Sequence, residues 1–367
     1  MKFPLLFITF LFVFSIASKA QFRKYSNEFL NIGVGARGLA MGSAQVASVN
    51  DGTAGYWNPA GLTGVQDHTN VNAMHAEYFS GIGKFDYASV ALPMSNNERT
   101  IAVSAIRFGV DQIANTLFLV DPAGNVNYDN ITEFSATDYA FIFSLAQKLK
   151  ETDESGLQFG VNAKVIYRHV GTFARAWGFG LDAGLQMYKD KWKFGIVGKD
   201  ITTTFNTWSF DFTEKEKQVL YLTDNEIPIK STELTAPRIT AGVGRNFDIG
   251  KKTSLLAEAN LDFTFDGQRN TVISSNIVSV DPKLGLEANI NDVLYLRAGV
   301  KNFQRTLDDG DSTNSSKTWI YQPSAGAGFR LQNVRIDYAF TNLANQSSAL
   351  YTHVFSLQLD LVNNKKK

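Results

Sequence analysis

Apolar and polar residues alternate with a period of two along most of the chain from about residue 69 onward. In residues 157–167, Leu, Phe, Val, Ala, Val and Tyr occupy alternate positions, and mainly polar or small residues separate them. This alternation predicts β-strands with one apolar face. The alternating stretches run to about ten residues or more, roughly twice the usual five or six of soluble sheets. They match the roughly 9–11 residues that a tilted strand needs to cross a bilayer.

About fourteen such strands are predicted, an even number as in single-chain bacterial outer-membrane barrels. Their predicted starts lie near residues 69, 83, 99, 136, 157, 173, 191, 238, 253, 283, 293, 321, 334 and 353. The short connections include 95–98, 189–190, 248–251, 291–292 and 332–333, and the long ones are 109–135, 200–237, 264–282 and 304–320. Every long connection falls on one end of the predicted sheet. Outer-membrane barrels sort their loops in this way, with short periplasmic turns and longer external loops, whereas a soluble sandwich has no cause to do so.

The N-terminus has the features of an export signal. A basic second residue precedes an almost wholly apolar run over residues 3–16, and Ser18-Lys19-Ala20 is a small-x-small cleavage site. We predict a signal peptide over residues 1–20, cleaved after Ala20. The apolar run of about 14 residues is shorter than the roughly 20 that span a bilayer as a helix. Alternation alone does not say which face points outward, and export to the cell envelope favours the membrane arrangement.

The predicted fold class is therefore all-β: a transmembrane antiparallel β-barrel of about 14 strands over residues 68–362, in the outer membrane. Residues 21–67 are rich in Gly, Ala and Asn and alternate little, which predicts a plug-like segment that folds back into the lumen. Residues 363–367 form a polar tail. Aromatic residues near predicted strand ends are typical of the girdles that contact outer-membrane lipid at the interface. They are Tyr78, Phe79, Tyr188, Trp192, Phe303, Trp319 and Tyr321.

Composition argues against several classes of function. The net charge is zero, so nucleic acid is not an expected partner. The chain has no cysteine, which excludes disulfides and cysteine metal sites. Its four histidines lack zinc-ligand spacing, and no catalytic constellation stands out, so we predict neither an enzyme nor a cofactor. Residues 33–38 match the letters of a dinucleotide-binding loop but lack the strand before and the βαβ unit around it, so small residues for tight packing are the favoured interpretation.

The N-terminal segment carries a resemblance to a known family. The sequence FLNIGVGARGLAMG over residues 29–42 is followed by DGTAG at 51–55 and WNPAGL at 57–62. This pattern resembles the N-terminal signature of the PorV/PorQ family, whose barrels are similar to FadL-type fatty-acid channels. Those channels share the Asn-Pro-Ala element that stands here as Asn58, Pro59 and Ala60.

The resemblance implies a fourteen-stranded, FadL-like outer-membrane barrel linked to type IX protein secretion. PorV-like members receive folded cargo through its C-terminal signal domain and pass it to a surface attachment machine. PorQ-like members work with a partner that processes and anchors cargo. The external loops of this chain are shorter than those expected of PorV itself.

Charged residues at lumen-facing positions are the first group of candidate functional residues. Two interpretations stand: a mutually paired network that stiffens the barrel and holds the plug, or a charged substrate path. In the plug-like segment, Arg37 is the best candidate to pair with an acidic wall residue. The lumen-facing set is Lys164, Arg168, Asp182, Glu258, Asp262, Glu287, Arg335, Asp337 and Asp360.

Three hypotheses about function follow. The favoured one is a barrel that binds type IX secretion components or cargo proteins. Its docking loop would be 200–237, which carries Trp208, Phe210, Phe212 and Tyr221 among charged residues. The third is a soluble periplasmic β-protein or an enzyme.

The second hypothesis is a FadL-like transporter with a small hydrophobic ligand in the lumen. It requires an apolar pocket against the plug-like segment and a lateral gap in the wall, and a packed, mainly polar lumen would count against it. Prolines in mid-strand would favour it, but all four candidates are predicted at strand edges: Pro93, Pro237, Pro282 and Pro323.

Overall fold

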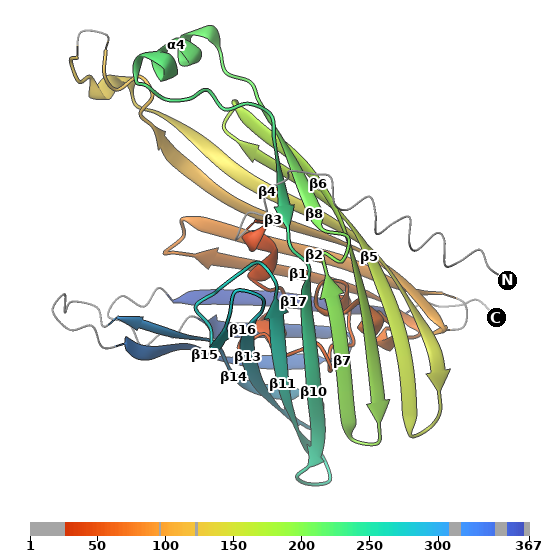
Figure 1. The fold of residues 1–367 in the computed structure, drawn as a ribbon. Helices are drawn as coiled ribbons and strands as arrows, with labels where there is room; N and C mark the ends of the chain where they lie inside the picture. The colour runs from red at the N-terminus through yellow and green to blue at the C-terminus, as the bar shows by residue number, and fades with distance from the viewer. Residues whose placement is uncertain (1–25, 95–96, 122–123, 308–316, 342–350, 363–367) are drawn as a thin grey trace.

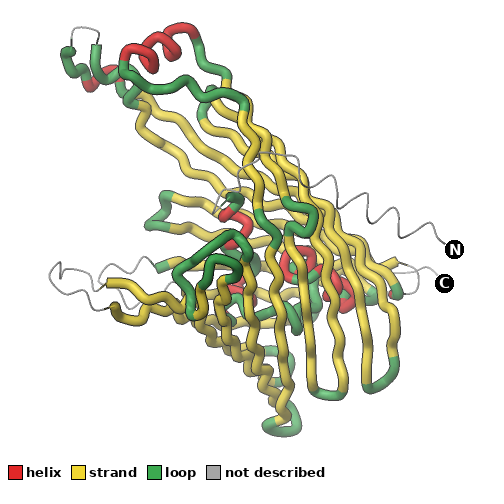
Figure 2. The backbone as a smooth tube through the Cα atoms, in the orientation of Figure 1, coloured by secondary structure: helices red, strands yellow, loops and turns green. Residues whose placement is uncertain are grey.

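The fold is a closed antiparallel β-barrel, seen in the computed structural model as a ribbon (Figure 1) and as a tube coloured by secondary structure (Figure 2). The structure describes residues 26–94, 97–121, 124–307, 317–341 and 351–362. Fourteen strands pair in sequence around the barrel, and β1 closes it by pairing with both β2 and β17. The predicted fold class, an all-β barrel of about 14 strands, is thus confirmed. The predicted signal peptide (1–20) and polar tail (363–367) lie outside the described residues.

The barrel strands are β1 (His68–Tyr78), β2 (Gly83–Met94), β3 (Arg99–Asn115), β4 (Thr132–Glu151), β5 (Ser155–Val170), β6 (Ala174–Lys189), β7 (Trp192–Lys199), β10 (Arg238–Asp248), β11 (Thr253–Thr264), β13 (Ser279–Ile290), β14 (Leu294–Leu307), β15 (Lys317–Leu331), β16 (Val334–Thr341) and β17 (Thr352–Val362). Three short strands accompany them: β8 (Thr204–Phe210), β9 (Ser231–Thr235) and β12 (Ile273–Ser274). The helices are η2 (Glu28–Asn31), α2 (Ala36–Ala40), α3 (Ala54–Trp57), η3 (Pro59–Gly64), η5 (Tyr128–Asn130) and α4 (Glu214–Leu222). Among the described residues, no helix has the length and apolar character needed to cross a membrane.

Strand positions agree closely with the alternation in the sequence. The largest differences are at β4, β13 and β15, which begin at residues 132, 279 and 317, four residues before the predicted starts at 136, 283 and 321. Of the described connections, those on one end of the barrel are all short turns. The long ones lie on the other end, together with the short connections 79–82 and 171–173. We refer to these ends as the short-turn end and the long-loop end.

The apolar face of the strands points outward. On β6, Phe179, Leu181 and Leu185 are 40–46% exposed on the outer surface, whereas their neighbours Asp182 and Gln186 are buried in the interior. A soluble barrel would bury the apolar face instead, and an outward apolar band is the arrangement of outer-membrane barrels. This orientation decides between the two alternatives that the alternation left open.

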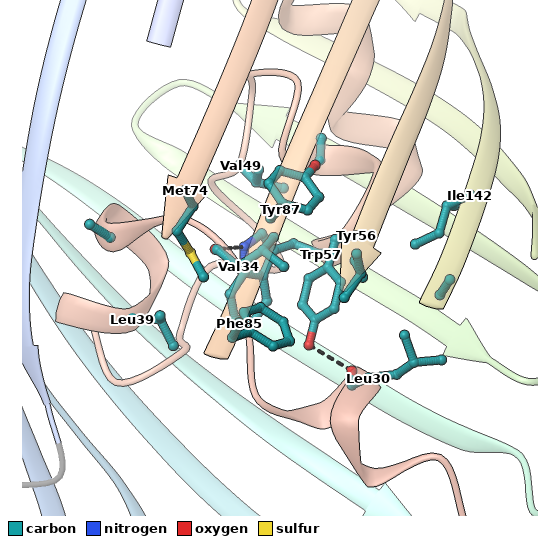
Figure 3. Packing of buried hydrophobic residues seen from close by; sticks show 14 of the residues in the cluster. Leu30, Val34, Leu39, Val49, Tyr56, Trp57, Met74, Phe85, Tyr87 and Ile142 are labelled. Carbon is teal, nitrogen blue, oxygen red and sulfur yellow. Dashed lines mark hydrogen bonds between the residues drawn. The ribbon is translucent and has the colours of Figure 1, made fainter. Parts of the chain in front are cut away.

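Residues 26–67, here called the N-terminal segment, lie inside the barrel (red and orange in Figure 1). Their apolar side chains pack against inward-facing residues of β1 and β2, and Figure 3 shows Tyr56, Trp57 and Phe85 in this cluster. The Tyr56 and Trp57 rings meet edge to face, with their centroids 4.9 Å apart. The Tyr56 hydroxyl donates to the Leu30 carbonyl (2.7 Å) and Trp57 Nε1 donates to the Val34 carbonyl (3.0 Å). Burial raises the pKa of the Tyr56 phenol, so this hydroxyl remains a neutral donor.

Six wall glycines allow the N-terminal segment to approach the strands at backbone distance. A Cβ added at any of them would lie within 3 Å of an atom of the segment. On β13, for example, a Cβ at Gly285 would be 2.6 Å from the Met41 carbonyl oxygen. We call these residues the glycine belt: Gly160, Gly184, Gly195, Gly285, Gly299 and Gly326. Because the belt spans strands from β5 to β15, it holds the segment from several sides of the barrel.

Candidate functional site

A cavity of about 440 Å³ lies on the long-loop side of the N-terminal segment. Tyr56 and Trp57 of the segment contribute to its lining, and the wall around it comes from β10, β11, β13, β14 and β15. Most of the lining side chains are polar. The charged ones are Glu28, Lys199, Arg238, Asp262, Arg269, Asp281, Lys283 and Lys301. We call this space the outer cavity.

Two lysines of the outer cavity stand apart from its ion pairs. Lys283 Nζ lies 2.5 Å from an Asp262 carboxylate oxygen. Lys199 Nζ instead lies over the Tyr56 ring, 4.1 Å from its centroid, and Lys301 Nζ donates to Ser43 Oγ at 3.2 Å. Within the part of the chain that the structure describes, neither Lys199 nor Lys301 has a carboxylate oxygen within 4.0 Å. Each of these two amino groups therefore lines the outer cavity without a carboxylate partner.

The barrel wall is interrupted beside this cavity. Strand β7 ends at Lys199 and β8 resumes at Thr204, while the neighbouring pair β9 and β10 is separated by Ala236 and Pro237. On β6, Ala183 pairs with Gly198 and Phe179 pairs with Phe205. Three residues of β6 therefore face six residues of the adjacent chain, an insertion of three. We call residues 200–203 and 236–237 the wall break.

The wall break lies within the apolar outer band. Ile201, which is 48% exposed, donates its backbone N–H to the carbonyl of Leu181, itself 43% exposed on the outer surface. Asp200 and Thr203 have φ of 56° and 61°, in the left-handed region, so the backbone bends at both residues. Irregular backbone is tolerated at membrane depth where it is covered by protein or lines a cavity. A cavity of about 40 Å³ lies there, lined by Ile142, Asp200 and Pro237 among others.

A buried ionic cluster holds the backbone where the wall break begins and ends. Lys164 Nζ lies 2.7 Å from Asp182 and 2.5 Å from Asp200, and the lysine side chain is only 4% exposed. The backbone N–H of Asp200 donates to Asp182 (2.8 Å), and the Thr204 hydroxyl donates to Asp200 (2.5 Å). The glycine at position 180 leaves room for the Thr204 side chain. Removing the lysine would leave two buried carboxylates without their cation, so the break depends on it.

An aromatic stack leads from the long-loop end towards the wall break. Trp208 and Phe210 are parallel at 6.2 Å between centroids, Phe210 and Phe212 at 6.3 Å, and Phe212 stacks on Phe173 at 5.6 Å. The Arg168 guanidinium lies 5.1 Å from the Trp208 ring centroid and also pairs with an acidic neighbour on β4. Three of the four residues predicted for a docking loop thus form one continuous apolar surface.

The predicted loop 200–237 is not a loop, which corrects the sequence interpretation. It contains β8, the helix α4 and β9, and Tyr221 lies on α4, 80% exposed and apart from the stack. The helix has a capping box in which Thr213 and Glu216 bond to each other's backbone N–H groups. That pattern of Thr and Glu three residues apart is visible in the sequence and could have revealed the helix.

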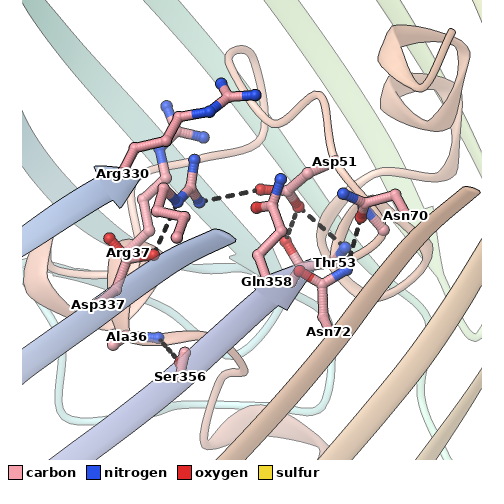
Figure 4. A network of polar contacts seen from close by, with 12 residues as sticks. Ala36, Arg37, Asp51, Thr53, Asn70, Asn72, Arg330, Asp337, Ser356 and Gln358 are labelled. Atoms are coloured by element: carbon pink, nitrogen blue, oxygen red, sulfur yellow. Dashed lines mark hydrogen bonds and ion pairs between the residues drawn. The ribbon is translucent and has the colours of Figure 1, made fainter. Parts of the chain in front are cut away.

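Between the N-terminal segment and the barrel wall, side chains of opposite charge form a buried series of ion pairs. Arg37 Nε lies 2.8 Å from Glu287, and the remaining contacts in the series are 2.6–3.3 Å long. The order is Arg37, Glu287, Arg297, Asp337, Arg335 and Asp51. The first and last residues of this series, Arg37 and Asp51, belong to the N-terminal segment, and the four residues between them belong to the barrel wall. Figure 4 shows Arg37, Asp51 and Asp337 in this network.

The other predicted lumen charges also contact the segment or the wall. Glu258 accepts from the Ala47 N–H at 2.8 Å, and Asp360 accepts from the Asn70 side chain at 2.6 Å. Sequence reasoning missed Arg297, although it alternates with outward-facing Leu296 on β14 and its position could have been inferred.

The Asn-Pro-Ala element joins the segment to the wall. Asn58 is fully buried, and its Nδ2 donates to the carbonyls of Val46 (3.1 Å) and Leu185 (3.0 Å). Its Oδ1 accepts from the Ala60 N–H at 3.2 Å. Pro59, which has no N–H to satisfy, begins η3.

A second cavity, of about 300 Å³, lies on the short-turn side and is lined by Arg37, Asp51, Lys193 and Arg330 among others. The N-terminal segment contributes to the lining of both this inner cavity and the outer one. In the described part of the chain, no three His, Asp or Glu residues gather as metal ligands would.

The prolines provide a second correction. Pro282 and Pro323 do not sit at strand edges, because they lie inside β13 and β15. Pro323 pairs with Val300, next to an irregularity in β14 between Lys301 and Gln304 that borders the outer cavity. The positions of these two prolines therefore do not count against a transporter.

The chain resembles solved membrane channels in fold. The toluene transporter TodX of Pseudomonas putida is 12% identical, with 90% of this chain and 99% of that chain covered, at a TM-score of 0.54. The toluene transporter TbuX of Ralstonia pickettii is 12% identical, covering 90% and 98% at 0.53, and the monoaromatic hydrocarbon channel CymD is 14% identical, with the same coverage and score. These likenesses show the fold alone: a closed antiparallel β-barrel like those of the three solved transporters and channels.

These similar structures are transporters and channels, not enzymes. No family model and no curated protein matches the chain, so the resemblance to the PorV/PorQ family has no support from those comparisons.

Proposed function

We propose that this barrel carries small hydrophobic compounds with an anionic head group across the outer face of the outer membrane. The compound enters the outer cavity from the long-loop end and leaves sideways through the wall break into the bilayer. The wall break is the observation that carries the proposal, since it places an interruption of the strand ladder in the apolar outer band beside a ligand-sized cavity. Export by a cleaved signal peptide over residues 1–20 is part of the same proposal.

A sideways exit is favoured because the N-terminal segment fills the lumen. The segment is buried, seated on the glycine belt and tied to the wall by the chain of charges from Arg37 to Asp51. Opening a straight path would disrupt these contacts together. In this proposal the segment acts as a fixed plug. An apolar compound that exits into lipid needs no such opening.

The lining of the path favours an amphiphile over a pure hydrocarbon. The aromatic stack and the Tyr56 and Trp57 rings offer apolar contact area. The rest of the outer cavity is polar. This differs from the apolar pocket expected of a FadL-like transporter, counts against a purely hydrophobic ligand and disfavours any ligand without a polar group. Lys199 and Lys301 suit a carboxylate, because charge-assisted hydrogen bonds to ammonium groups are stronger than neutral ones.

Closing the wall break tests the proposal. Deleting Ile201, Thr202 and Thr203 would keep Phe205 opposite Phe179 and make the strand continuous, since the insertion is three residues long. Uptake of radiolabelled octanoate and of toluene is measured in a Gram-negative host that lacks its own transporters. Octanoate uptake is expected with the unaltered protein, above that of toluene, and should fall to background with the deletion.

The matched control is Ile201→Ala with Thr202→Ala, which keeps the insertion and changes only side chains. It should retain octanoate uptake. Both variants must migrate as folded barrels on unheated gels. A folded deletion variant that still takes up octanoate would exclude the sideways exit, and an unaltered protein that takes up neither probe would exclude transport.

A second candidate function is favoured by α4. This helix stands at the long-loop end, well away from the barrel (Figure 1), and exposes Tyr221 by 80% and Leu222 by 60%. Exposed apolar side chains of this kind suit a protein partner. We propose as the alternative that the barrel docks a component or cargo of type IX secretion here, as the family resemblance implies.

The test replaces residues 213–230 with a short Gly-Ser linker, followed by pull-down from gently solubilised outer membranes. Loss of type IX components or cargo, with octanoate uptake unchanged, is the expected result for docking. Identical pull-downs from both proteins would reject it. The fold comparisons support the transporter more directly than this alternative.

A further inference from the structure

An apolar groove of about 630 Å³ lies on the outer wall of the barrel, across β10, β11, β13 and β14. Its floor is formed by small residues on adjacent strands. Ala259 lies between Val243 and Leu284, and Ala257 lies in register with Leu286. The large neighbours stand 37–49% exposed on either side of the alanines. The result is a trough in the apolar band that runs along β11, with side chains of β10 and β13 on its two sides.

Arg245 stands at the edge of this groove and also points outward. Its guanidinium carbon lies 4.8 Å from the ring centroid of Trp192 and 5.1 Å from that of Phe247. Among the described residues, no carboxylate oxygen lies within 4.0 Å of it. An unpaired arginine on the lipid face costs about 2–4 kcal/mol at the bilayer midplane and about 0–1 near the interface.

The position of Arg245 identifies the leaflet. Trp192 is the first residue of β7, and Arg245 is close to the last residue of β10, so both lie towards the short-turn end. Tryptophan beside an outward arginine is typical of the interfacial level, where the charge reaches lipid head groups. The short-turn end is the periplasmic one in barrels of this class, and the adjacent leaflet consists of phospholipid.

We propose that this groove is a binding site for one phospholipid of the periplasmic leaflet. The lipid phosphate accepts hydrogen bonds from Arg245, whose guanidinium the two rings hold in place. One acyl chain lies in the groove over Ala257 and Ala259. Phosphate chemistry matches the arginine fork, and an acyl chain matches the apolar trough. The inference does not depend on the proposed transport function.

The experiment measures phospholipid that remains bound after purification. The full-length barrel is extracted in mild detergent, washed and examined by native mass spectrometry, with phosphorus content as a second measure. Two variants remove the two halves of the site: Arg245→Gln removes the charge, and Ala259→Phe fills the groove. Arg175→Gln is the matched control. Arg175 also points outward, but it lies at the start of β6, towards the long-loop end of the barrel.

We expect the unaltered protein and Arg175→Gln to retain one phospholipid per barrel. Each site variant should lower this occupancy by about tenfold, equivalent to about 1.4 kcal/mol. An unaltered barrel that carries no phospholipid would overturn the proposal. So would an Arg245→Gln barrel that is folded and retains as much lipid as the control.

Discussion

Gly285→Ala is expected to loosen the N-terminal segment without unfolding the barrel. The added methyl group would lie 2.6 Å from the Met41 carbonyl oxygen, 2.9 Å from Met41 Cβ and 3.2 Å from Ala44 Cβ. Carbon atoms in favourable contact are about 3.5–4.0 Å apart, so the segment or the strand must shift. The atoms approached are backbone and Cβ atoms, which cannot rotate out of the way.

Overpacking of this kind costs about 1–3 kcal/mol. Since about 1.4 kcal/mol is a factor of ten, local opening of the segment should become about 5- to 150-fold more frequent. Hydrogen–deuterium exchange with mass spectrometry measures this directly on peptides that cover residues 36–48. Their buried amides, such as that of Ser43, which donates to the Gly38 carbonyl at 2.8 Å, should exchange faster by this factor.

The control is Gly244→Ala on β10, another inward-facing wall glycine. A methyl group there would be 3.5 Å from its nearest neighbour, Leu256 Cδ1, an ordinary contact. Exchange in the segment should stay at the level of the unaltered protein. Equal exchange in the Gly285→Ala and Gly244→Ala variants would refute the reasoning, because close approach to the wall would then contribute nothing to the seating of the segment.

Three further predictions follow from buried polar contacts and from the aromatic stack. Asn58→Ala should lower barrel stability by about 1–3 kcal/mol, because it leaves buried groups without partners, and urea unfolding in detergent will measure this. Lys164→Met should cost about 3–5 kcal/mol by leaving Asp182 and Asp200 without their cation, and faster exchange at residues 200–204 will report it, while an unchanged rate would count against the ionic cluster. Trp208→Ala should weaken octanoate binding by about 2- to 12-fold, as expected for the loss of about 0.5–1.5 kcal/mol of aromatic contact. Equal affinity of the variant and the unaltered protein in a binding titration would show that the ligand does not contact the stack.

The strands could be predicted from the sequence because each one repeats the same physical constraint. Alternation places residues such as Phe179 in the lipid and Asp182 in the interior, and tight turns punctuate the series. The direction of the apolar face could not be derived from alternation alone. It follows from the exposure of these side chains in the closed barrel.

The wall break could not be predicted, because it interrupts the pattern on which strand prediction relies. The three extra residues after Lys199 end the alternation, so residues 200–237 read as one long loop. Only the pairing of β6 with both β7 and β8 reveals that the strand resumes. The capping box at Thr213 and the alternation in β8 were the signals available in the sequence.

The partners within the charge network were equally hidden. Arg37 and Glu287 are 250 residues apart in the chain, and only closure of the barrel brings them together. Sequence reasoning could nominate both residues, since one lies in the Gly-rich segment and the other at a lumen-facing strand position. It could not supply the pairing, nor the role of Arg297 in the middle of the network.

The central claim is that a ligand passes from the outer cavity to the wall break and not through the N-terminal segment. The most direct measurement is a crystal structure of the protein with a bromine-labelled alkyl carboxylate, located by the anomalous signal of bromine. We predict the carboxylate at Lys199 or Lys301 and bromine between Tyr56 and Pro237, on the long-loop side of the segment. Bromine in the inner cavity beside Arg37, with the segment displaced, would contradict it.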